Sequence, residues 1–403
     1  MWVNIFLYMK EKVKIILLIF VLIQPMVLKA QQTKLDSFLA HTPIFIRGSF
    51  QNGCVIPTNE FIRGQNLLKD TIDSYNSISF LLLKQTKGDK LWEQVYGYPV
   101  FGIGIYSALF NETKELGVPI SVYGFFSAPF VRINKLSFNY ELGLGLAFNW
   151  NSFDPVENPN NIAISAEQST YIEAGLNLEY RVARRYYLSA GYGFYHFSNG
   201  KLKLPNKGLN TKAVKFSMRY QLNNVSSSFI KRGVPKFEKH FEWDIDVYGG
   251  VKNVIYKGGD VDIITKYEGV YYPVYGINNT FSRSLNYKSK VGFGFSIGYN
   301  GAINAQIAVE EGELDPVGQP FGHHLDVNIY PSYELVVDRL AFVLQPGLYI
   351  YRKKTSELTP GFYQRIGVKY HFLKDYFLGV SLRAFHFRES DFIEWNIGRR
   401  VKW

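Results

Sequence analysis

LSFNYELGLGLAFNW, residues 136–150, is the stretch that decides the fold, because large apolar residues alternate in it with small or polar ones. Every second residue from Leu136 to Trp150 is large and apolar, and the residues between them include Asn139 and Glu141. Since successive side chains of a β-strand point to opposite faces, one face meets an apolar medium and the other a polar one. The stretch is long for a soluble strand but suits a tilted strand that crosses a membrane.

The same alternation recurs along the chain, for example in residues 172–182 and 376–384. A soluble β-sandwich also alternates, but it shares one apolar core and usually has shorter strands. We therefore predict an all-β fold, a transmembrane antiparallel β-barrel. Fifteen runs qualify as strands: 42–57, 75–86, 98–110, 117–131, 136–150, 170–183, 186–199, 211–222, 241–253, 285–300, 323–336, 340–352, 361–372, 376–388 and 391–403. Because bacterial barrels use an even number of strands, we expect fourteen, with twelve as the next choice and 42–57 as the weakest run.

The first thirty residues have the composition of an export signal. Lys10, Lys12 and Lys14 precede a nearly unbroken apolar run, and small Ala30 stands before polar Gln31. This order is typical of a cleaved signal peptide, with an uncleaved anchor helix as the alternative. We expect residues 1–30 to be removed and 31–403 to form a single outer-membrane barrel domain, integral to the bacterial outer membrane.

Composition narrows the function further. The net charge is +11, but lysine and arginine are scattered, so we expect no nucleic-acid partner for an exported chain. The only cysteine, Cys54, cannot form an internal disulfide. The neighbouring His323 and His324 point to opposite faces of a strand, so no shared metal site is expected there.

The residues that carry chemistry stand at the end of the run 186–198. Its even-numbered positions are apolar until His196 and Ser198, which project from the same face two residues apart. That face is the one predicted to meet lipid. If 199–210 connects two strands of a hairpin, Asn210 approaches His196 from the neighbouring strand.

This trio suits nucleophilic catalysis. A histidine takes the proton of a serine hydroxyl and returns it to the leaving group, while a third polar residue orients the histidine. Donors for an oxyanion hole are available in the turn, from Asn199 and Gly200 or from Asn206 and Gly208.

Residues 196–208, HFSNGKLKLPNKG, resemble the active-site signature of the lipid A 3-O-deacylase or acyloxyacyl hydrolase family. Its pattern of His-x-Ser-Asn followed by Pro-Asn-x-Gly is matched without a gap. The resemblance implies an outer-membrane barrel that removes an ester-linked acyl chain from lipid A, with His196 as base and Ser198 as nucleophile. Better-known members carry a glutamate where this chain has Asn210.

The segment is also similar to outer-membrane phospholipase A, which uses His-x-Ser-Asn-Gly and an asparagine twelve residues after the serine, the position of Asn210 here. That enzyme binds calcium through acidic and hydroxyl residues of the intervening loop. This loop instead has Lys201, Lys203 and Lys207, so we expect no calcium and no other cofactor. The lysines suit the phosphates of lipopolysaccharide.

The sequence thus predicts a hydrolase that deacylates lipid A of lipopolysaccharide in the outer leaflet through His196, Ser198 and Asn210. The alternatives are a calcium-independent phospholipase A and a non-catalytic barrel, such as a pore or transporter. A homodimer is possible on sequence grounds.

Overall fold

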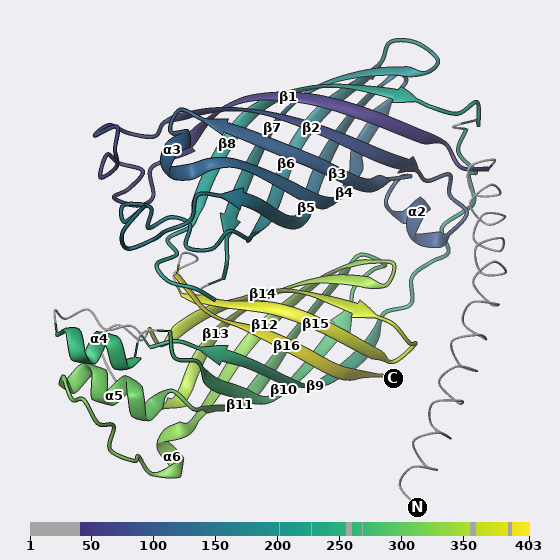
Figure 1. Cartoon of the computed structure of the whole chain (residues 1–403). Helices are drawn as coiled ribbons and strands as arrows, with labels where there is room; N and C mark the ends of the chain where they lie inside the picture. The colour runs from purple at the N-terminus through teal and green to yellow at the C-terminus, as the bar shows by residue number, and fades with distance from the viewer. Residues whose placement is uncertain are drawn as a thin grey trace, which may run out of the picture.

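The chain folds into two closed antiparallel β-barrels of eight strands each in a computed structural model (Figure 1). The structure describes residues 41–403 except 201, 227, 255–259, 268, 355–359 and 386–388. The predicted signal peptide, residues 1–30, lies outside the described residues. Among the described residues, no helix has the length and hydropathy needed to cross a membrane.

The first barrel closes because β1 pairs with both β2 and β8. Its strands follow one another around the ring in chain order: β1 (Ile44–Ile56), β2 (Ser74–Gln85), β3 (Val100–Phe110), β4 (Gly117–Ile133), β5 (Leu136–Trp150), β6 (Ser169–Arg181), β7 (Tyr186–Ser198) and β8 (Leu209–Gln221). Two short helices, α2 (Leu91–Val95) and α3 (Thr113–Leu116), lie in its connections.

Residues 222–239 lead into the second barrel, which closes where β9 pairs with β16. Its strands are β9 (His240–Lys252), β10 (Tyr272–Ser284), β11 (Ser289–Asn300), β12 (Leu325–Val337), β13 (Leu340–Arg352), β14 (Phe362–His371), β15 (Tyr376–Phe385) and β16 (Glu389–Lys402). The helices α4 (Val261–Tyr267), α5 (Ile303–Glu311) and α6 (Phe321–His324) belong to connections at one end.

The all-β antiparallel prediction is confirmed, but the expectation of one barrel of fourteen or twelve strands is wrong. Alternation is a local pattern that identifies a strand and its two faces, whereas the choice of closing partner depends on pairing between distant segments. The run 42–57 contains a strand, as predicted, but no local feature of it indicates that this strand pairs with β8 and so closes a ring.

The prediction also missed β10, because none of the fifteen predicted runs covers residues 272–284. In the structure, Asn278, Thr280 and Ser282 point into the polar interior, and Ile277 and Phe281 point outward. Small polar residues that usually indicate turns here fill a narrow lumen.

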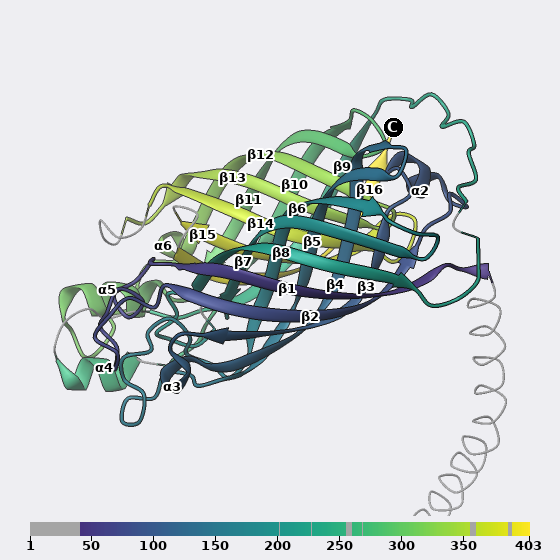
Figure 2. The same ribbon diagram turned by 90° about the horizontal axis from the view of Figure 1, so that it is seen from above.

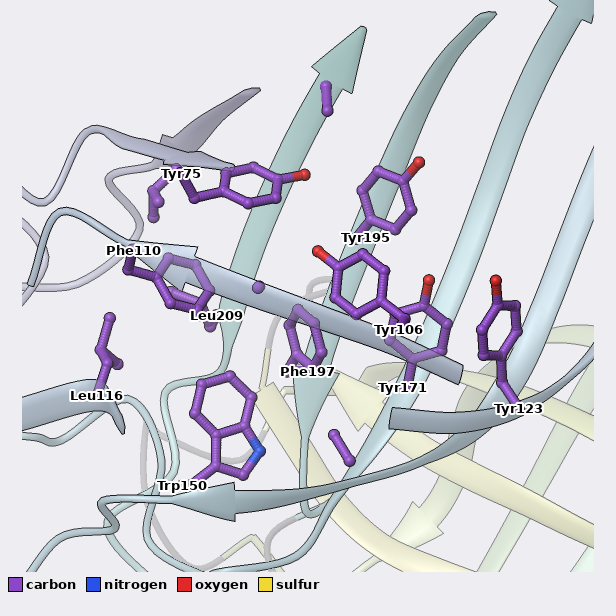
Figure 3. Packing of buried hydrophobic residues seen from close by; sticks show 14 of the residues in the cluster. Tyr75, Tyr106, Phe110, Leu116, Tyr123, Trp150, Tyr171, Tyr195, Phe197 and Leu209 are labelled. Carbon is purple, nitrogen blue, oxygen red and sulfur yellow. The ribbon is translucent and has the colours of Figure 1, made fainter. Parts of the chain in front are cut away.

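The outer walls carry the apolar residues and the interiors are filled by side chains. In the first barrel, the rings of Tyr106, Tyr171, Tyr195 and Phe197 are buried and pack against one another inside the barrel, as Figure 3 shows. Glu141 is also buried there, where it forms ion pairs with Arg47 and Lys215 and accepts from the Asn177 amide. An eight-stranded barrel is just wide enough to be filled in this way.

Trp150 is the exception to the predicted outward face of β5, because it lies buried inside the barrel against Phe197. Asn149 has a φ of 64°, which interrupts the alternation just before the strand ends. The indole then turns inward, and its Nε1 donates to Ser169 Oγ over 3.0 Å.

The two barrels lie side by side with equivalent ends together, as both views show (Figures 1 and 2). One end holds the long connections, 57–73, 151–168, 199–208, 253–271 and 301–324. The other end holds the turns 134–135, 182–185, 285–288, 338–339 and 372–375, the connection 86–99 with α2, the start of β1 and the end of β16. The end with the long connections is here called the long-loop end. Ser198, the last residue of β7, lies there.

Candidate active site

His196 and Asn210 face each other across two neighbouring strands. They are paired in the register of β7 and β8, and His196 Nδ1 lies 2.7 Å from Asn210 Oδ1. The predicted approach of Asn210 to His196 through a hairpin is therefore observed. Because an amide oxygen only accepts, this contact assigns the proton to Nδ1 and leaves Nε2 with a free lone pair.

Ser198 lies on the same outer face as His196, and it is only 9% exposed. Its hydroxyl oxygen accepts two hydrogen bonds, from Asn206 Nδ2 at 2.8 Å and from Gly200 N at 3.2 Å. No direct hydrogen bond joins Ser198 to His196 in the part of the chain that the structure describes. Two donors thus hold the hydroxyl oxygen of Ser198 at the end of the strand.

Gly208 lies beside both His196 and Ser198. A Cβ at Gly208 would lie 3.3 Å from His196 Cε1 and 3.8 Å from Ser198 Cβ, and its φ is 72°. Glycine is therefore required twice, for the left-handed backbone and for the space beside the imidazole.

The four donors considered for an oxyanion hole are not equivalent. The Gly208 N–H already donates to Ala163 O over 3.0 Å, and the Asn199 N–H points to Asn206 Oδ1 at 3.4 Å. Gly200 N and Asn206 Nδ2 are the two that reach Ser198. The long connection between β7 and β8 thus folds back so that its own turn and its own amide surround the serine.

Sequence reasoning missed the support that this connection receives from the loop 151–168. Lys207 N and Gly208 N donate to Ile162 O and Ala163 O, and Asn199 Nδ2 donates to Ser165 Oγ over 2.8 Å. Asn59 adds a hydrogen bond from its amide to Gly208 O. These contacts join segments far apart in the chain, and no local signal in the sequence announces them.

Apolar side chains continue from the serine along the wall. Ile172 is the register partner of His196, and together with Phe194 and Leu144 it stays exposed on the outer face. Lys203 and Lys207 are exposed on the other side, in the connection itself, while Lys201 lies outside the described residues. The site therefore stands between an apolar wall and a basic loop.

No cluster of histidine, cysteine and acidic residues that could hold a metal ion is found among the described residues. His386, which shares lipid-face parity in the sequence, lies outside them. The donor set around Ser198 consists of amides, backbone N–H groups and one imidazole, which suits general-base chemistry.

Two family models match the chain, one for each barrel. The model described as lipid A 3-O-deacylase (PagL) matches residues 82–219, which include the whole segment from His196 to Asn210. The model described as acyloxyacyl hydrolase, C-terminal domain, matches residues 241–403, the second barrel. No curated protein matches the sequence.

Among solved structures, the outer membrane enzyme PagL is similar at 17% identity, with 42% of this chain and 97% of that chain covered and a TM-score of 0.29. A mutant of the porin of Rh. blastica is similar at 9% identity, with 90% and 100% covered and a TM-score of 0.17. Likenesses this weak carry no weight for the function.

Proposed function

Because the chain belongs to the lipid A 3-O-deacylase family of ester hydrolases, we propose that it removes an ester-linked acyl chain from lipid A with Ser198, His196 and Asn210 as its catalytic residues. The observation that carries this proposal is the 2.7 Å contact between His196 Nδ1 and Asn210 Oδ1, beside a serine on the same face. This is the arrangement that a histidine base needs.

In the first step, Ser198 Oγ attacks the ester carbonyl carbon while His196 Nε2 takes the hydroxyl proton. The carbonyl oxygen becomes an oxyanion, and we assign its stabilisation to Gly200 N and Asn206 Nδ2, the two donors that reach Ser198 Oγ. The C–O bond to the sugar then breaks, and the departing oxygen receives the proton from His196.

In the second step, a water molecule attacks the acyl-serine, with His196 again as base. The products are a free fatty acid and the original serine. Asn210 keeps the imidazole in one tautomer and orientation throughout, although its neutral amide stabilises the imidazolium less than a carboxylate does.

The position of the site supports lipid A of the outer leaflet as the substrate. Outer-membrane barrels have short periplasmic turns and longer extracellular loops, so the long-loop end, with Ser198, is assigned to the outside. Exposed Ile172 and Phe194 offer the acyl chain an apolar wall, and Lys203 and Lys207 suit the sugar phosphates.

The filled interiors argue against a pore. Buried tyrosine rings occupy the first barrel, and buried Arg365 and Arg383 with their partner Glu394 occupy the second. Side chains of this size leave an eight-stranded barrel no room for a channel along the described residues.

The test is mass spectrometry of lipid A and phospholipids from cells that express the wild type, Ser198→Ala or the matched control Ser189→Ala on the same strand. We expect one acyl chain to be lost from lipid A with the wild type and the control, and with Ser198→Ala lipid A is expected to keep it. Lysophospholipid with intact lipid A would instead identify a phospholipase A. Unchanged pools with folded wild-type protein would refute hydrolysis.

A further inference from the structure

The turn beside Ser198 is packed against the second barrel. Gly200 has a φ of 64°, and a Cβ built on it would lie 2.8 Å from Ile393 Cδ1 and 3.7 Å from Leu382 Cδ1. The backbone that donates to Ser198 Oγ is therefore in van der Waals contact with side chains from a different barrel. Any shift of those side chains changes where the Gly200 N–H points.

Leu382 and Ile393 form one small apolar patch. They are direct partners in the register of β15 and β16, and they project from the outer wall. Both are half-buried, whereas Trp395 and Ile397 on the same face of β16 are 68% and 51% exposed. The partial burial is thus found at Leu382 and Ile393, the two residues that contact the turn at Gly200.

A second contact joins the same two regions. Tyr271, just before β10 in the second barrel, donates from its hydroxyl to Leu202 O over 2.7 Å. Leu202 lies two residues after Gly200 in the chain. The connection that carries Asn206 is therefore tied to the second barrel by a polar contact as well as an apolar one.

At the opposite end, the barrels meet through another cluster. Tyr96 and Ala128 of the first barrel pack with Val337 of the second, and the Tyr96 hydroxyl donates to Val336 O over 2.6 Å. Leu144, Ile172 and Phe194 on the outer face of β5, β6 and β7 remain exposed. The first barrel thus keeps an exposed apolar strip of these three side chains beside His196, the register partner of Ile172.

We propose that the second barrel completes the acyl-ester site, with Ile393 and Leu382 as positioning residues for the Gly200 turn and as one wall for the acyl chain of the substrate. The opposite wall is the strip of Ile172, Phe194 and Leu144. This inference rests on the proposed function of Ser198, because it assigns the chain of that same ester to the seam between the barrels. A fatty acyl chain is the occupant that suits two apolar walls open to the bilayer.

The test uses the full-length protein in detergent micelles, with p-nitrophenyl butyrate and p-nitrophenyl palmitate as probes. Ile393→Ala is compared with Ile397→Ala, the same change on the same face away from the turn. We expect Ile393→Ala to lower kcat for both esters on the order of tenfold through the loosened turn. Ile393→Leu keeps a terminal δ-methyl group that can reach the Gly200 turn, and it is expected to retain most of the rate.

A bulky substitution at Ile393 tests whether this residue forms one wall for the acyl chain. Ile393→Trp narrows the seam, so we expect kcat/KM for palmitate to fall about tenfold relative to butyrate, mainly through KM. Ile397→Trp is the control and is expected to leave this ratio unchanged. Heat-modifiable migration in gel electrophoresis shows that each variant is folded.

The outcomes separate the two proposals. If Ser198→Ala is inactive and every folded Ile393 variant behaves as the wild type does, the role of the second barrel is refuted while the hydrolase stands. If Ser198→Ala retains full activity, the proposed function itself fails. Equal losses in the Ile393 and Ile397 variants would also refute a local role for Ile393.

Discussion

At the scale of single residues, the contact between His196 and Asn210 decides whether the imidazole works as a base. Asn210→Ala removes the acceptor for Nδ1–H, so the ring loses its fixed tautomer, and we expect kcat to fall about a hundredfold or more. Asn210→Asp keeps an acceptor at the same place and adds a charge that stabilises imidazolium. Steady-state hydrolysis of p-nitrophenyl butyrate measures both.

The aspartate variant is therefore expected to be at least as active as the wild type, which serves as the control for misfolding at this position. Equal inactivation of Asn210→Ala and Asn210→Asp, with both proteins folded, would show that Asn210 has another role. A fully active Asn210→Ala would remove it from the catalytic group.

At the scale of elements, the strands of the first barrel are held together across the lumen by buried ion pairs. Glu141 on β5 pairs with Arg47 on β1 and Lys215 on β8, and Lys215 also pairs with Glu173 on β6. Glu141→Gln leaves two buried cations with too little opposing charge, so we expect a loss of about 3–5 kcal/mol in the free energy of unfolding. Urea unfolding in lipid vesicles measures it.

The matched control is Glu167→Gln, the same change at an exposed loop position, which is expected to alter stability by less than about 0.5 kcal/mol. Similar midpoints for Glu141→Gln and the wild type would mean that these ion pairs contribute no net stability. Such a result is physically reasonable only if water enters the lumen and solvates the cations.

At the scale of the whole molecule, the long-loop ends of both barrels lie together at one end (Figure 2), so we expect them to face the same side of the membrane. In a Cys54→Ala background, Val156→Cys in the loop 151–168 is expected to react with a membrane-impermeant maleimide on intact cells. Val234→Cys in the linker 222–239 is expected to react only after lysis. Both native valines are exposed, Val156 to 85% and Val234 to 47%, so the protein itself shields neither position from the reagent.

The reverse labelling pattern would place Ser198 at the periplasmic side, and lipid A of the outer leaflet would then be out of reach. Labelling of both positions on intact cells would indicate leaky cells, which a periplasmic marker protein detects. The orientation is thus tested independently of activity.

Much of this architecture is encoded by local patterns in the sequence. The alternation in 136–150 predicts which side chains point outward, with Trp150 as the exception, and the spacing from His196 to Asn210 predicts a hairpin that opposes these two residues, as observed. Both features depend on neighbouring residues and on the period of a strand, so a single sequence contains them.

Other features depend on contacts between distant segments, which no local pattern encodes. Closure of β1 on β8 and of β9 on β16 makes two rings instead of one, and the polar strand β10 is recognisable only by the lumen it fills. The support of Gly208 by Ala163 and the contact of Gly200 with Ile393 arise only when separate loops and separate barrels are brought together. Periodicity therefore determines the strands and their faces, whereas long-range packing decides the number of barrels and the surroundings of Ser198.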